Sequence, residues 1–128
     1  MTQTAMDSLK IAHRHLEKVE AAWFDPVDWA DLAMYGFYCL EACVVAITLH
    51  LGQPRPKSTH PAKVALARSF AASHDLPDIE QLLIALNDRR KFEAYGDVEL
   101  AEDDDLDAQD VADEIRGYFE AVEAMVAP

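Results

Sequence analysis

A cluster of cations with a nearby tyrosine is the part of this chain whose residue types and spacing best suit chemistry. It lies in the sequence LNDRRKFEAYGD at 86–97, and its members are Arg89, Arg90, Lys91 and Tyr95. Successive helical residues project about 100° apart, so three consecutive cations cannot share one solvated stripe. We therefore expect at least one of them to face a partner or a groove, as part of a ligand-binding site. The alternative is that the cations only complement the dipole at the end of a helix.

Spacing within this helix also predicts which side chains meet. Residues four apart share a helix face. Arg89 is therefore expected beside Glu93, and Lys91 beside Tyr95.

Glu41 is a second candidate, because it is the only formally charged residue between Asp31 and Arg55. It lies on the helix that the sequence predicts to be most buried, where an unpaired carboxylate is costly. We therefore expect a cation from a neighbouring helix, Arg89 or Arg90, to pair with it. This pair is expected to be structural, with a ligand-binding role for Glu41 as the alternative.

The only two cysteines, Cys39 and Cys43, are four residues apart in an apolar helix. Disulfide geometry within one helix is poor, so they are expected to be reduced core thiols. His50 could join them as a metal ligand, but no second group completes a tetrahedral set. We expect no metal site and no cofactor.

Composition limits the chain to one domain, 1–128, with enough hydrophobic content (51%) for one ordinary core. The net charge of −13 is local, because the segment 97–114 holds ten acids and no base, whereas 1–96 has ten Lys or Arg against twelve Asp or Glu. This acidic segment is expected to be a solvated loop and a helix N-terminus, with a divalent-cation site or a partner-facing arm as alternatives. The global charge argues against long free DNA or RNA as the main ligand.

Hydropathy and the N-terminus bear on location. The longest apolar stretch, 33–52, contains Glu41 and His50. The first residues lack the basic and apolar regions of a signal peptide. We expect a soluble, cytoplasmic protein without a membrane partner.

Helical periodicity runs through nearly the whole chain, and hairpin signals are missing from the sequence. This predicts an all-α fold, an antiparallel up-and-down bundle of four to five helices. The second helix is expected to begin at Asp25-Pro26, with Asp25 as N-cap and Pro26 as the first helical residue. The expected helices are 6–24, 26–50 or 26–51, 59–74, one that follows Asp78 and leads into 89–91, and one that starts at 107 or 108 and reaches 125.

This order of elements resembles the HEPN domain family. The resemblance is carried by YGFYCLEA at 35–42, by PKSTH at 56–60 and by the helix at 86–95, and it spans nearly the whole chain. HEPN domains are antiparallel helical bundles that commonly dimerise. Many are ribonucleases or toxins, and others accompany nucleotidyltransferases or serve as noncatalytic partners.

The nuclease members of this family carry an Arg followed after four to six residues by a His. In this chain Arg89 and Arg90 match the arginine, but Tyr95 stands where the histidine would fall. Cleavage by internal attack needs a group that exchanges protons near neutral pH, which imidazole does and tyrosine does poorly. His60 is the one histidine that could replace it in space.

The leading hypothesis is therefore a noncatalytic HEPN-like interaction or regulatory module, beside a nucleotidyltransferase or in a toxin–antitoxin system. It is expected to form a homodimer, because the second helix looks apolar on more faces than one small bundle covers. The alternative is a divergent ribonuclease or nucleotide-binding domain that uses Arg89, Arg90, Tyr95 and His60. A third hypothesis is an acidic decoy that occupies a nucleic-acid-binding partner through 97–114.

Overall fold

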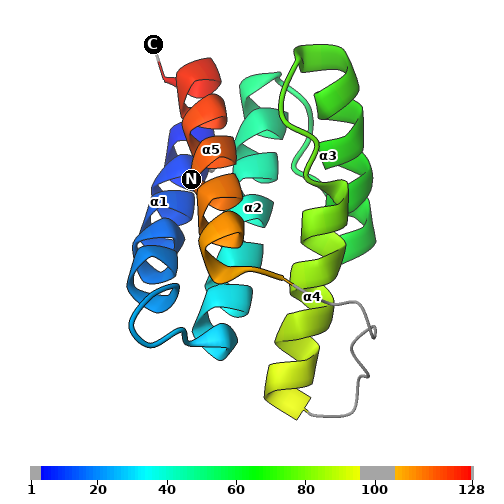
Figure 1. Cartoon of the computed structure of the whole chain (residues 1–128). Coiled ribbons are helices and arrows are strands. Elements are labelled where there is room, and N and C mark those ends of the chain that lie inside the picture. Colours follow the sequence, from blue (N-terminus) through cyan, green and yellow to red (C-terminus); the bar gives the residue numbers. More distant parts are fainter. Residues whose placement is uncertain (1–3, 96–105, 128) are drawn as a thin grey trace.

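The part of the chain that the structure describes forms five helices (Figure 1). The computed structural model describes residues 4–95 and 106–127, and no strand occurs among them. The all-α bundle expected from periodicity is confirmed. The helices are α1 (Ala5–Ala22), α2 (Trp29–His50), α3 (His60–His74), α4 (Glu80–Tyr95) and α5 (Ala108–Val126).

Four of the helices, α1, α2, α4 and α5, alternate in direction and form the bundle itself (Figure 1). Side-chain contacts agree with this arrangement: near one end of the α1–α5 pair Arg116 bonds Glu20, and further along Phe119 lies against His13. α3 runs beside the bundle between α2 and α4, and its only buried residues are Ala67 and Phe70. The bundle core is therefore complete without most of α3.

Helix starts are set by short polar caps. Thr4 and Asp7 form a reciprocal capping box at α1, and the side chain of Asp107 accepts a hydrogen bond from the backbone at the start of α5. The expected start of the second helix at Asp25-Pro26 is wrong. Asp28 is the N-cap, and its carboxylate accepts a bond from the backbone N–H of Asp31 at 3.1 Å.

The reason for this later start is a turn between α1 and α2. Asp25 has a left-handed φ of 51°, which is incompatible with a helix N-cap, and the N–H of Asp28 bonds back to the carbonyl of Ala22 at 2.8 Å. The chain must complete this turn before α2 can begin.

α2 is the central helix of the bundle. Thirteen of its 22 residues are buried, and it packs against the other four helices. By length and hydropathy α2 could cross a membrane, but 72% of its most apolar stretch is buried inside the bundle. Packing in the core therefore accounts for its apolar character.

The partly exposed residues of α2 bear on the expected homodimer. Apart from Trp29 in the first turn, they lie along one stripe of the helix, which consists of Met34, Tyr35, Tyr38, Ala42 and Leu49. The other faces of α2 are covered within the chain, so the apolar surface left over is narrower than the sequence suggested. The homodimer stays a prediction, and this stripe is the face of α2 still open to a second copy.

Two helical glycines differ in the space around them, so their replacement by alanine should change the free energy of unfolding differently. Gly117 in α5 has open space where a Cβ would lie, so Gly117→Ala should stabilise the protein by about 1 kcal/mol through helix propensity. A Cβ at Gly36 would lie 2.6 Å from Cδ1 of Ile115, so Gly36→Ala should lose that gain to overpacking. Urea unfolding of both variants measures the difference, and equal gains would contradict the close approach of α2 to α5.

Candidate functional site

The buried carboxylate of Glu41 is paired with an imidazole and an ammonium group from the first turn of α3. Nδ1 of His60 lies 2.7 Å from Oε2 of Glu41, and Nζ of Lys63 lies 3.6 Å from the same oxygen. Glu41 is only 8% exposed, so these partners compensate its desolvation. The expected pairing of Glu41 with Arg89 or Arg90 is therefore wrong.

The geometry fixes the tautomer of His60. An ionised carboxylate can only accept hydrogen bonds, so Nδ1 of His60 carries the proton that points at Glu41, and Nε2 remains for another partner. The imidazole is 38% exposed, and its edge contacts the ring of Phe37 at a centroid distance of 4.8 Å. Glu41 therefore fixes the orientation of the His60 imidazole, while part of the ring remains exposed to solvent.

Arg90 lies on the same ring of Phe37. Its guanidinium carbon is 5.4 Å from the centroid of Phe37 and 5.9 Å from that of Tyr38, and one terminal nitrogen donates to Oδ1 of Asn87 at 2.8 Å. Its Nε is buried and has no hydrogen-bond partner among the described residues. No described carboxylate pairs with Arg90, whereas Arg89 pairs with Glu93 and Lys63 pairs with Glu41.

The guanidinium of Arg89 already has partners within the chain. Its Nε donates to Oε1 of Glu93 at 2.9 Å, as the spacing of four predicted. Its guanidinium also lies over Trp29, 4.5 Å from the ring centroid, and near Phe92 at 5.8 Å. The three consecutive cations therefore do not act as one cluster. Arg89 is paired with Glu93, Arg90 lies over the rings of Phe37 and Tyr38, and Lys91 is partly exposed.

A row of aromatic rings continues from Arg90 along α2 and α1. Tyr38 lies 5.7 Å from His15 between ring centroids, and His15 stacks on Tyr35 at 5.9 Å with an interplanar angle of 29°. Burial, and secondarily the charge of Arg14, lowers the pKa of His15 below its ordinary value. His15 therefore presents a neutral ring near pH 7. The row Tyr38–His15–Tyr35 offers aromatic surface next to the guanidinium.

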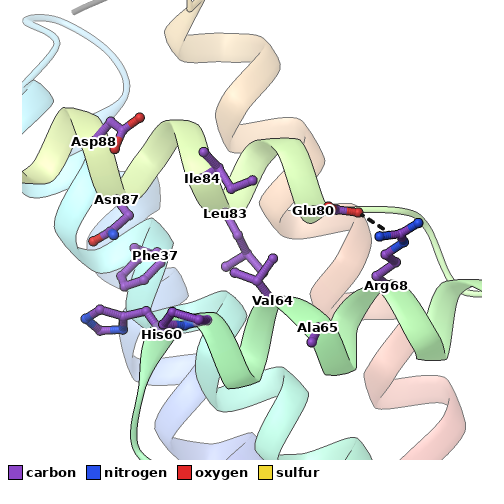
Figure 2. A pocket seen from close by; sticks show the side chains of 11 residues that line it. Phe37, His60, Val64, Ala65, Arg68, Glu80, Leu83, Ile84, Asn87 and Asp88 are labelled. Carbon is purple, nitrogen blue, oxygen red and sulfur yellow. Dashed lines mark ion pairs between the residues drawn. The ribbon is translucent and has the colours of Figure 1, made fainter.

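A groove of about 420 Å³ opens between α3 and α4 (Figure 2). His60, Phe37 and Asn87 line one end of it, so the groove adjoins the pairs described above. Its floor and walls are mostly apolar, and the described cysteines and tyrosines do not line it. A mostly apolar lining with a few polar groups is typical of a ligand-binding groove.

The side chain of Tyr95 and the acidic residues from 97 to 105 are outside the part that the structure describes. Cys39 and Cys43 are free and fully buried, and a hydrogen bond to Cys39 together with burial raises the pKa of the Cys43 thiol well above its usual value. His50 is exposed, away from these core thiols. Within the described residues, no group of three or more His, Cys, Asp or Glu could hold a metal ion.

Comparison of the chain with known protein families, curated proteins and solved structures finds no match.

The site also contains residues that the sequence argument missed. These are His15, Tyr35, Phe37, Tyr38, Lys63 and Asn87. Tyr35 and Tyr38 are three residues apart and so share a helix face, which was a usable signal. Lys63 is likewise three residues after His60, which places both on the face of α3 that meets Glu41.

The pairing at Glu41 predicts a specific pattern of stability. Replacing His60 and Lys63 together by Ala would leave a buried carboxylate uncompensated and should cost about 3 kcal/mol. Adding Glu41→Met to that variant should recover most of the loss, because the unpaired charge is then gone. Urea unfolding at neutral pH measures the three free energies of unfolding.

Arg90→Ala is the matched control, because it removes a cation from the next helix. Glu41→Met should give no recovery in that background, since Arg90 does not pair with Glu41. Recovery in both backgrounds would contradict the assignment of His60 and Lys63 as the partners of Glu41.

Proposed function

We propose that this chain is a noncatalytic, HEPN-like binding module whose ligand is a nucleotide or a short single-stranded RNA. The observation that carries the proposal is the state of Arg90. Its guanidinium is held against Phe37 and Tyr38, it uses a single described hydrogen bond, and it has no carboxylate partner among the described residues. A guanidinium with unused donors is suited to a phosphate group.

The aromatic row gives such a ligand a second point of contact. Tyr38, His15 and Tyr35 are partly exposed, and each ring can stack on a nucleobase. Stacking of one base on an aromatic side chain is worth about 1 to 3 kcal/mol. Phosphate binding at Arg90 and base stacking at the row together favour a ligand that carries both groups.

The charge of the chain supports a short ligand. A net charge of −13 repels a long polyanion, whereas a nucleotide or a few residues of RNA need only local cations. A regulatory role beside a nucleotidyltransferase or in a toxin–antitoxin system, a homodimer, and a cytoplasmic location remain predictions that rest on the resemblance and on composition.

One observation favours a second candidate function, cleavage of RNA. The bond from His60 to Glu41 orients the imidazole as a general acid or base would require, and Phe37 contacts both His60 and Arg90. In this reading a histidine from α3 would replace the one missing after Arg90. The noncatalytic function stays first, because no described contact joins His60 to Arg90 directly.

Binding is tested by fluorescence anisotropy with a short fluorescein-labelled oligoadenylate RNA at low salt. Arg90→Ala should weaken binding about tenfold or more, since a charge-assisted phosphate contact is worth about 1.5 to 3 kcal/mol. Arg89→Ala is the matched control and should change affinity less than twofold, because Glu93 already neutralises Arg89. Equal losses in the two variants would indicate unspecific charge attraction, and no binding by the unaltered protein would refute the proposed ligand.

Catalysis is tested by incubating the same protein with mixed single-stranded RNA, with and without divalent metal. We expect no appreciable degradation. Cleavage that is lost in both Arg90→Ala and His60→Asn would instead place the ribonuclease first. Cleavage that survives both changes would point to a contaminating nuclease, and a fresh preparation decides it.

A further inference from the structure

The groove between α3 and α4 has the dimensions and lining of a small-molecule site. Its volume of about 420 Å³ lies in the usual range for ligand pockets. Phe37, Val64, Leu83 and Ile84 supply an apolar surface, and Figure 2 shows Val64, Leu83 and Ile84 in its central part. Ile84 is 41% exposed, which is unusual for a large aliphatic side chain beside a groove.

One end of the groove is bounded by an ion pair. Nε of Arg68 lies 3.7 Å from Oε2 of Glu80, and Figure 2 shows this pair away from His60. Because the two charges satisfy each other, this end offers a ligand no unpaired charge.

The opposite end carries hydrogen-bonding groups in a fixed orientation. Arginine can only donate, so the atom of Asn87 that faces Arg90 is its oxygen, and the two N–H bonds of the Asn87 amide are left without a described acceptor. His60 is fixed in the same way by Glu41, which leaves Nε2 of the imidazole. Both residues line the groove. With the proton on Nδ1, Nε2 is an acceptor, so this end offers a ligand a donor at Asn87 and an acceptor at His60.

The charges around this polar end balance. Lys63 and Arg90 are the cations, and Glu41 and the exposed Asp88 are the carboxylates. A charged ligand would lose hydration without a net opposite charge to compensate it. An uncharged ligand has no such cost.

We propose that this groove binds an uncharged small molecule that has an aromatic or branched apolar body and a primary-amide head. The apolar body lies on Val64, Leu83 and Ile84. The carbonyl oxygen of the ligand accepts a hydrogen bond from the amide of Asn87, and the N–H of the ligand's amide donates to Nε2 of His60. This site is separate from the phosphate and base contacts proposed at Arg90 and Tyr38.

The test uses three ligands of one shape: naphthamide, naphthoate and naphthylmethylammonium. Calorimetry or chemical-shift titration should give the tightest binding for the amide, with both charged analogues weaker by about tenfold. Asn87→Leu keeps the bulk of the side chain but removes its donors, so it should weaken the amide about tenfold and leave naphthalene binding unchanged. Ala65 lines the groove and is exposed, so Ala65→Trp should abolish binding by filling it.

Ala72→Trp is the matched control, because Ala72 is exposed on the same helix but does not line the groove. It should bind all three ligands as the unaltered protein does. Ala65→Trp should also leave the RNA affinity unchanged, so failure here and failure of the proposed function can be told apart. Absence of amide binding, equal binding of the three ligands, or binding that persists in Ala65→Trp would each overturn the proposal.

Discussion

The burial of one carboxylate in the central helix is the constraint on which the rest of the structure depends. Glu41 is nearly inaccessible to solvent, and an uncompensated carboxylate there would cost several kcal/mol, a large share of the stability of a small domain. His60 and Lys63 compensate it, and both belong to the first turn of α3. Their position places the start of α3 near the middle of α2. With α3 in this position, a groove forms between α3 and α4, and His60 contacts Phe37.

Most of the fold could be predicted from residue spacing. Most apolar residues of α1 and α5 recur with helical period and are buried in the core, and the cap at Asp107 begins α5 where expected. The start of α2 was misplaced because Asp25-Pro26 and Asp28 both look like helix starts. A choice between them depends on the backbone of the preceding turn, where Asp25 adopts a positive φ.

The candidate site was only partly predictable. Burial alone implies that Glu41 needs a cation, but periodicity does not say which helix lies against which face. The sequence therefore points to the place where cations are most concentrated, which is not where the partner lies. Arg90 instead packs on Phe37 and Tyr38, and a histidine distant in sequence takes the carboxylate. Contacts between helices decide such pairings, whereas contacts within a helix, such as Arg89 with Glu93, follow from spacing.

The small buried surface of α3 has a consequence for local unfolding of the protein. With Ala67 and Phe70 as its only buried residues, α3 can detach as a local unit at a lower free energy than the four-helix bundle. Detachment also removes His60 and Lys63 from Glu41, so the opened state carries a carboxylate without partners in the otherwise intact bundle. Charge thus couples a peripheral helix to the centre of the core.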